Sequence, residues 1–364
     1  MADNQYRMDK IIRNTLYVGG LVAIYFLIDY LSFYLLPFFL ALVAAYILEP
    51  IVKFFRYKLR FKNRSVSVLS TLLTVSLIIF IAWILLIPQI TAEFKTLNYL
   101  LKDYLKQEAG YEGTIPGFVD EQIRLFLQSD IIKEFVSREN IEKYGVDVVN
   151  RVWEGMIGLT GILANVFIIF TFLLYLLFIM MSYDSFSRSW EGVLPPLYRK
   201  NFVKVFNDME AEMKIYFRGQ SRIVLILSIL FATGFRLIDL PLGIALGIVT
   251  GIINFVPYLQ LVSIPIALLL AGLSAMEGGT SYWTEAGLVL LVFAVVQGIQ
   301  EAILIPKIMG NATGINPALI LLSLSIFGGL LGLVGMVIAL PVTSLIIKYY
   351  THFILNEDEL VDSN

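Results

Sequence analysis

The stretch Val296-Gln-Gly-Ile-Gln-Glu-Ala-Ile-Leu-Ile-Pro-Lys307 places one carboxylate and two amides inside a long apolar run. A charged side chain at membrane depth costs a few kcal/mol or more, so Glu301 is a candidate functional residue. On a helix, Gln297 lies within about one turn of both Gln300 and Glu301, so all three are predicted to share one face. We expect Pro306 to end the helix. The alternative is that Glu301 lies near the end of its span and reaches the headgroups.

The composition is that of a membrane protein with several spans. Apolar residues make up 58% of the 364 residues, charged residues make up 15%, and the mean hydropathy is +0.79. Soluble domains contain roughly half apolar and a quarter charged residues. Several apolar runs reach the length of about 18 residues that indicates a transmembrane helix. We therefore predict an all-α integral membrane protein with about eight apolar segments.

Several classes of site are disfavoured by the residues that the chain lacks. It has no cysteine and a single histidine, His352 in the C-terminal tail. Disulfides and thiolate metal sites are thus excluded, and a metal site or catalytic triad built on histidine is not expected. There is no P-loop motif for ATP hydrolysis. Since no nucleophile–base pair stands out either, we expect neither an enzyme nor a cofactor. The net charge of −2 gives no indication of nucleic-acid binding.

Charge patterning gives a topology for the N-terminal half. Residues 1–13 form a short basic terminus, and residues 14–90 hold three predicted spans near 15–28, 34–48 and 66–90, the first two divided by Asp29 and Pro37. The loop 53–64 carries six basic residues and no acid, so the positive-inside rule makes it cytoplasmic. Between two spans, such a loop favours contact with anionic lipid over nucleic-acid binding.

A polar region follows the third span and is predicted to form a small helical domain outside the membrane. Thr91–Glu154 holds eight bases and twelve acids, as suits the outer side, and we assign residues 91–155 to this domain. Apolar residues recur in it at helical spacing: Phe118, Val119, Ile123, Phe126, Leu127 and Ile131. Residues 156–182 form the fourth predicted span and residues 183–218 a cytoplasmic amphipathic segment, broken at Pro195-Pro196.

The C-terminal transport core, residues 219–350, alternates uninterrupted and interrupted apolar segments before a cytoplasmic tail, 351–364. The first interruption is Asn254-Phe-Val-Pro-Tyr258 and the second is Gly328-Gly-Leu-Leu-Gly332. Two interrupted segments at corresponding places in two repeats indicate the binding site of a transporter. Re-entrant hairpins would give the repeats inverted topology, whereas crossing segments would leave them parallel. Gly243, Gly247 and Gly251 also predict a smooth helix face for close packing.

The C-terminal motifs together resemble the autoinducer-2 exporter family of bacterial inner-membrane proteins. The resemblance rests on the following stretches: Tyr216-Phe-Arg-Gly-Gln220, Asn254-Phe-Val-Pro-Tyr258, Gln297 with its following acid, Pro306-Lys-Ile-Met-Gly310, Asn316-Pro317, Phe327-Gly-Gly-Leu-Leu-Gly-Leu-Val-Gly-Met336 and Ala339-Leu-Pro341. It implies an exporter of small molecules in the cell (inner) membrane, with the quorum-sensing signal as the name-giving substrate, and sodium–proton exchange as another proposed activity.

We predict a multi-pass membrane transporter that exports a small molecule, with a proton or sodium gradient as a plausible driving force and a homo-oligomeric assembly. Glu301 is the candidate coupling residue. The predicted pathway residues are Glu301, Gln297, Gln300, Asn254, Pro257, Tyr258, Gly328, Gly329, Gly332, Arg218 and Gln220. The rival hypotheses are a sodium–proton antiporter and a passive pore or membrane scaffold. The expected partners are the substrate, the coupling ion and the lipid bilayer, and not nucleic acid.

The predicted topology can be tested by labelling single cysteines, because the chain has no native one. The N-terminus, the loop 53–64, Tyr183–Arg218 and the C-terminus should be cytoplasmic, and Thr91–Glu154 should lie outside. We expect an impermeant maleimide to label a Ser129→Cys variant in intact cells. Labelling of this variant only after the membrane is breached would contradict the topology.

Overall fold

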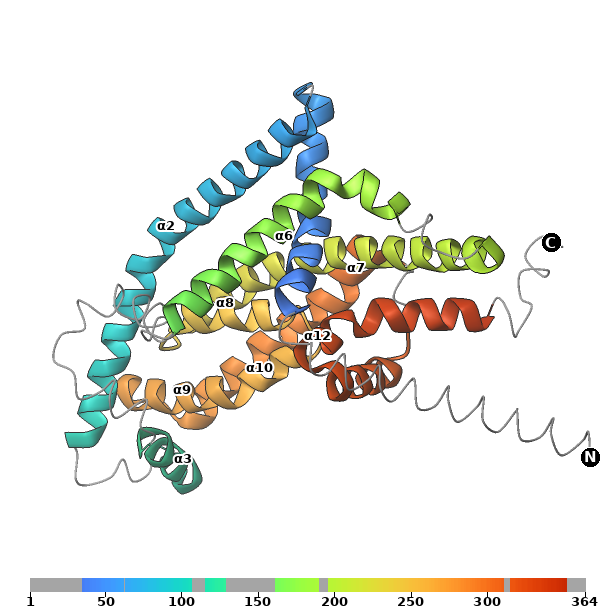
Figure 1. The fold of residues 1–364 in the computed structure, drawn as a ribbon. Helices are drawn as coiled ribbons and strands as arrows, with labels where there is room; N and C mark the ends of the chain where they lie inside the picture. The colour runs from blue at the N-terminus through green and yellow to red at the C-terminus, as the bar shows by residue number, and fades with distance from the viewer. Residues whose placement is uncertain are drawn as a thin grey trace, which may run out of the picture. The chain divides into compact units, whose positions relative to one another are not determined.

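The chain is built of helices throughout the parts that the structure describes, and no strand occurs in them (Figure 1). The computed structural model describes residues 35–61, 63–106, 115–128, 161–189, 196–310 and 315–351. Six helices in these ranges are long and apolar enough to cross a membrane, and two shorter apolar helices cover Ile168–Ser182 and Gly243–Ile253. The predicted fold class, an all-α integral membrane protein, is confirmed.

The helices follow one another in this order: Leu35–Lys58, whose last turn Phe54–Lys58 is a π-helix, then α2 (Arg64–Lys106), α3 (Gly117–Gln128), α6 (Gly161–Ser189), α7 (Pro196–Leu237), α8 (Gly243–Ile253), the 3₁₀-helix η4 (Leu259–Val262), α9 (Ser263–Gly278), α10 (Tyr282–Ile299), the π-helix η5 (Gln300–Leu304), α11 (Ile305–Met309) and α12 (Pro317–Tyr350). The chain divides into two compact units. One unit comprises residues 1–46, 167–213 and 315–364, and the other comprises residues 47–166 and 214–314.

Several helices are longer than the membrane spans that the sequence predicts. The span predicted near 34–48 continues to Lys58, so the expected loop 53–64 contracts to a few residues around Arg60, whose φ is 57°. The fourth span, predicted at 156–182, is helical to Ser189 in the described part. These predictions were wrong about where helices end because lysine and arginine are good helix formers. Charge marks the membrane boundary but does not end a helix. The span predicted near 15–28 lies outside the described residues.

Helix α2 shows the same effect over a longer distance. It has 43 residues and contains Pro88, so it is about 65 Å long, roughly twice the hydrocarbon thickness of a bilayer. The helix therefore continues well past Ile90, the predicted end of the span, and α2 must project beyond the membrane. Its apolar part exposes side chains in every direction, as a helix surrounded by lipid would: Leu73, Leu77, Ile78, Ile79, Phe80, Ile81, Trp83, Ile84 and Leu85.

Helix α3, which lies in the region predicted to form the outer domain, packs at the C-terminal end of α2. Val119 and Ile123 are buried, and a methyl group added at Gly272 of α9 would meet both. The Tyr104 hydroxyl at the end of α2 donates to Asp120 at 2.5 Å, and Arg124 donates to the same carboxylate at 2.7 Å. Burial opposes ionisation, but these two hydrogen bonds and the Arg124 charge hold the pKa of Asp120 below its usual value. The predicted apolar contact Ile131 lies outside the described residues.

The predicted glycine face of α8 is confirmed as a contact with α7. A methyl group added at Gly247 would collide with the backbone nitrogen of Ala232, and one added at Gly251 would collide with the Ser228 hydroxyl. The two backbones therefore lie too close for a side chain between them, as in small-residue packing of membrane helices. The contact is made by the apolar second half of α7. This half continues the amphipathic first half without a break, as one helix from Pro196 to Leu237.

The first interrupted segment folds back on itself. Leu242 and Ile244 at the start of α8 line the same cavity as Ser274 and Gly278 at the end of α9. The two helices are thus the arms of a hairpin whose tip is the break Asn254–Tyr258 (Figure 1). With 11 residues, α8 is only about 17 Å long, too short to cross a bilayer.

The second interrupted segment, α12, also reverses direction. Gly332 has φ 60° and ψ −140°, which breaks the helix. A methyl group added at Gly335 would collide with the carbonyl oxygen of Phe327, although residues eight apart on a straight helix are about 12 Å apart. Figure 1 shows the two arms of α12. The sequence left open whether the interrupted segments cross or re-enter, and both reversals favour re-entrant hairpins. Pro341 lies within the second arm without breaking it.

The α7–α8 contact gives a prediction with an internal control. Substitution of Gly247 by alanine should force α7 and α8 apart, and overpacking of this kind costs about 1–3 kcal/mol. Gly287 on α10 has no neighbouring atom within 4 Å of an added methyl group. We expect the melting temperature of the detergent-solubilised protein to fall clearly for Gly247→Ala and to change little for Gly287→Ala. Equal melting temperatures of the two variants would contradict the close contact.

Candidate functional site

The break between α8 and η4 is a buried turn that leaves polar side chains without partners. Pro257 has no backbone N–H, and Tyr258 adopts φ 66°, so the helix cannot continue through them. Asn254 ends α8 and is completely buried, as is Thr250 one turn earlier. Neither the two side-chain polar atoms of Asn254 nor the Thr250 hydroxyl has a hydrogen-bond partner among the described residues. Buried polar atoms are normally paired, so these atoms indicate a place for water or a solute.

Helix α7 holds the break in place from one side. The Gln220 side-chain amide donates to the backbone oxygen of Asn254 at 2.5 Å, and Phe217 stacks on Phe255 with ring centroids 6.1 Å apart. One turn before Gln220, the buried hydroxyl of Tyr216 is also without a partner among the described residues. Arg218 is half-buried and lies two residues from Gln220, a spacing that points the two side chains away from each other.

A chain of amides runs from the break to Glu301. Gln260 on η4 is completely buried, and its amide nitrogen donates to the Gln297 side-chain oxygen at 3.0 Å. The Gln297 amide nitrogen in turn donates to a Glu301 carboxylate oxygen at 2.7 Å. Each amide therefore donates to the next side chain in the direction of Glu301. The chain links the hairpin tip to α10 through side chains only.

Gln300 and Glu301, the first two residues of the π-helix η5, lie in different surroundings. Gln297 and Glu301 share a face and are bonded, but Gln300 is buried with an unpaired amide oxygen while Glu301 is exposed. Pro306 does not end the helix as expected, because the wider turn of η5 precedes it. The Ile305 N–H bonds the Gln300 carbonyl, and the chain stays helical to Met309. Single-turn π-helices of this kind are frequent at functional sites.

The second break belongs to the other unit. Gly328 and Gly329 precede Gly332 in the first arm of α12, and a methyl group at Gly328 would lie 2.8 Å from Met336 in the second arm. The sequence also predicts that this break approaches Asn254–Tyr258. The two breaks lie in different units, so their approach stays a prediction.

Two sets of polar contacts at the bases of the hairpins were missed by the sequence reasoning. The first set joins α2 to α8: the Glu93 carboxylate accepts from the backbone N–H groups of Ile244 and Ala245 at 2.9 and 3.1 Å. This interaction caps the helix N-terminus and is favoured by its dipole. It lies beside a cavity of 770 Å³ that Glu93, Arg236, Asp239, Glu277 and Glu285 line. No local signal could have revealed a contact across 151 residues.

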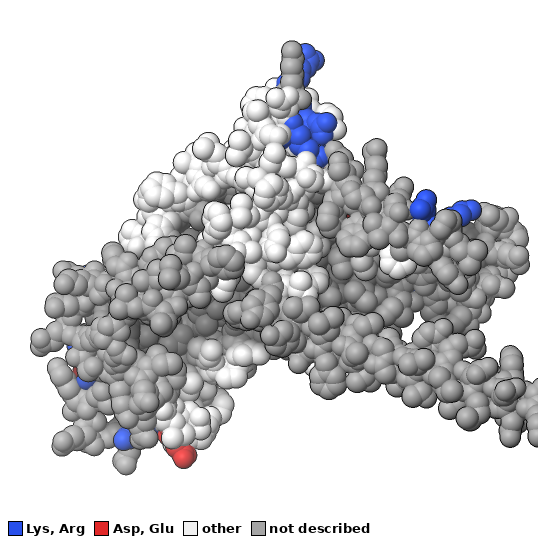
Figure 2. All heavy atoms as spheres, viewed as in Figure 1, with Lys and Arg blue, Asp and Glu red and all other residues white. Residues whose placement is uncertain are grey.

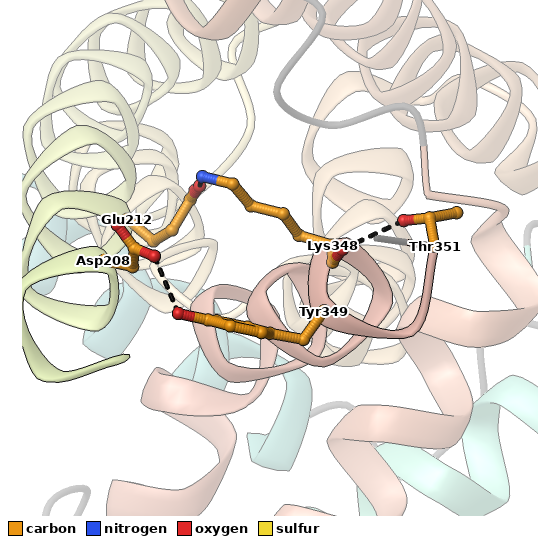
Figure 3. A network of polar contacts seen from close by, with 5 residues as sticks. All are labelled: Asp208, Glu212, Lys348, Tyr349 and Thr351. Atoms are coloured by element: carbon orange, nitrogen blue, oxygen red, sulfur yellow. Dashed lines mark hydrogen bonds and ion pairs between the residues drawn. The ribbon is translucent and has the colours of Figure 1, made fainter. Parts of the chain in front are cut away.

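The second set joins the end of α12 to the amphipathic half of α7 (Figure 3). The Tyr349 hydroxyl donates to Asp208 at 2.7 Å, and the Lys348 ammonium lies 3.4 Å from Glu212. The sequence contains one signal for these contacts, the acids Asp208 and Glu212 four residues apart on an amphipathic helix. This spacing does not show that Tyr349 and Lys348 are their partners. Among the described residues, no cluster of three or more metal-ligating side chains occurs.

Comparisons with known proteins agree over almost the whole chain. The family profile described as AI-2E family transporter matches residues 15–354. The transport protein YueF of Bacillus subtilis is 24% identical over 90% of this chain and 86% of its own length. The permease PerM of Escherichia coli is 24% identical over 90% and 89%. The protein named as the AI-2 transport protein TqsA of Escherichia coli is 23% identical over 90% and 89%.

The unpaired atoms of Asn254 give a stability prediction. Leucine has a similar volume and removes two polar atoms that the described protein leaves without partners, so Asn254→Leu should keep or raise the melting temperature. If the site binds a solute, the same change should abolish transport, as is typical of strained functional sites. Thr250→Val removes the neighbouring hydroxyl and should act in the same direction. A large loss of thermal stability in both variants would mean that these atoms have structural partners.

Proposed function

Because the chain belongs to the AI-2E transporter family, we propose that it exports a small molecule across the cytoplasmic membrane and that the break Asn254–Tyr258 is part of its substrate site. The family and the membrane-spanning helices support a multi-pass membrane transporter in general. The site is inferred from a group of buried polar atoms that have no hydrogen-bond partner in the described part of the chain. They belong to Tyr216, Thr250, Asn254, Gln260 and Gln300.

The physical argument rests on where such atoms can exist. In the hydrocarbon core, irregular backbone and unpaired polar groups persist only inside protein or beside water. The hairpin tip carries both features, and its arms α8 and α9 flank it with apolar residues. A polar solute that replaces the missing hydrogen bonds would therefore gain more there than at any lipid-facing surface. The atoms involved belong to amides and hydroxyls, which supports a substrate recognised by hydrogen bonds.

Glu301 is the proposed coupling residue. It follows the start of the apolar span Tyr282–Met309 by 19 residues, or about 28 Å, and precedes its end by about 12 Å. A carboxylate that is exposed on the chain at this depth must face water or another protein surface rather than lipid. This position supports proton exchange at Glu301, and it also supports a homo-oligomer in which a second copy covers this surface.

Sodium–proton exchange is a second candidate function. The side-chain oxygens of Asn254, Gln260 and Gln300 are buried and unpaired among the described residues, and hard cations prefer oxygen ligands. Sodium-dependent proton flux in proteoliposomes that contain no other solute would favour this function. A metabolite-dependent proton flux that does not require sodium would favour export.

The role of Glu301 is tested by its conservative substitution. Glu301→Gln keeps the hydrogen bond to Gln297 but fixes the neutral state, so gradient-driven export should fall to the background level. The substrate is first identified as the metabolite whose amount in the medium rises with expression of the wild-type chain. Its efflux is then measured in proteoliposomes with an imposed proton gradient.

The matched control is Glu285→Gln, which changes a half-buried glutamate near the opposite end of the same apolar span. The Glu285 carboxylate accepts a hydrogen bond from the nearby Thr280 hydroxyl at 2.8 Å. This variant should transport like the wild type. Full gradient-driven flux by Glu301→Gln, at equal amounts of folded protein, would remove Glu301 from the mechanism.

A further inference from the structure

The turn between the first described helix and α2 concentrates positive charge on a structured protrusion. We call Lys53, Arg56, Lys58 and Arg60 with the intervening Phe54, Tyr57 and Leu59 the basic tip. Lys53, Lys58 and Arg60 are exposed, and the segment contains no acid. Figure 2 shows the blue Lys and Arg atoms gathered at this turn, above the uncharged surface of the two helices.

The basic tip is held in a defined shape. Arg64 at the start of α2 pairs with the buried Glu49 at 3.3 Å, which closes the base of the turn and leaves Arg64 out of the exposed charge. The rings of Phe55 and Phe61 stack across the turn with centroids 5.8 Å apart. Since the turn is fixed by this ion pair and this stack, its cations have preferred positions even when nothing is bound.

Aromatic rings separate the cations of the basic tip. The Arg56 guanidinium lies 5.6 Å from the Tyr57 ring centroid, and the Lys58 ammonium lies 5.4 Å from the Phe54 ring centroid. The side chains of Phe54, Tyr57 and Leu59 are 47%, 68% and 49% exposed. A surface that alternates cations with exposed aromatic and aliphatic groups suits the membrane interface, where one part of each residue contacts headgroups and the other contacts acyl chains.

We propose that the basic tip binds the phosphate groups of anionic phospholipids on the predicted cytoplasmic face. The helices on both sides, Leu35–Lys58 and Arg64–Tyr104, are long and apolar enough to span the membrane, so the turn between them must lie at a membrane surface. Clusters of Lys and Arg immediately beside a membrane span attract anionic headgroups. Lipid fits better than RNA because the exposed apolar groups between the cations need an apolar contact.

The test places a fluorescent reporter in the basic tip. Leu59→Cys provides a single site for a nitrobenzoxadiazole label because the chain has no cysteine. The labelled protein is reconstituted with phosphatidylglycerol or phosphatidylcholine that carries a spin label on the headgroup. We expect several-fold stronger quenching by phosphatidylglycerol than by phosphatidylcholine, and the difference should shrink in concentrated salt.

Two charge-matched variants make the result specific. The triple variant Lys53→Gln, Lys58→Gln, Arg60→Gln should lose the preference for phosphatidylglycerol. The control triple variant Lys200→Gln, Lys204→Gln, Lys307→Gln neutralises three exposed lysines elsewhere and should keep it, at unchanged melting temperatures of both proteins. Equal quenching by the two lipids, an equal loss in the control, or a response to RNA without any lipid preference would each overturn the proposal.

Discussion

The absence of water from the hydrocarbon core is the constraint on which the described structure depends. A helix satisfies its own backbone there, but a break does not, so each break must find its partners within the protein. At the tip of the first hairpin, short-range backbone bonds such as Leu259 N–H to Val256 O at 3.1 Å provide some of them. The side chain of Gln220 provides another. These bonds pair part of the backbone at the tip, whereas the buried side chains of Asn254 and Thr250 have no hydrogen-bond partner among the described residues.

Close packing against α7 makes such a tip possible. Gly247 and Gly251 bring α8 into backbone contact with α7, and Phe231 and Phe235 of α7 form an aromatic cluster with Phe293 of α10 at centroid distances of 5.1 and 5.5 Å. Packing of this kind fixes α8 and α10 relative to the same helix, so that Gln260 and Gln297 can meet between them. The amide chain to Glu301 is thus a consequence of how tightly three apolar helices pack.

The sequence predicted the features that arise from local chemistry. The breaks at Pro257 and Gly332 follow from proline and glycine, and the glycine face follows from a four-residue spacing. The features it could not predict depend on the rest of the fold. Pro306 stays within a helix because a π-turn precedes it, and α2 continues to Lys106 because polar residues form helices as well outside a membrane as apolar ones do inside. The Glu93 contact with α8 requires the folded chain.

The two hairpins are tied at their bases by contacts of different kinds. Glu93 binds two backbone N–H groups of α8, a charge-assisted arrangement that also benefits from the helix dipole. The α12 hairpin depends on side chains: the Lys348–Glu212 pair is 3.4 Å long with a lysine that is 58% exposed, and such pairs contribute about 0–1 kcal/mol. The Tyr349–Asp208 hydrogen bond, at 2.7 Å, is shorter. A hairpin must break these contacts to move as a body, so the α8 hairpin would lose bonds between a carboxylate and the backbone, and the α12 hairpin would lose bonds between side chains.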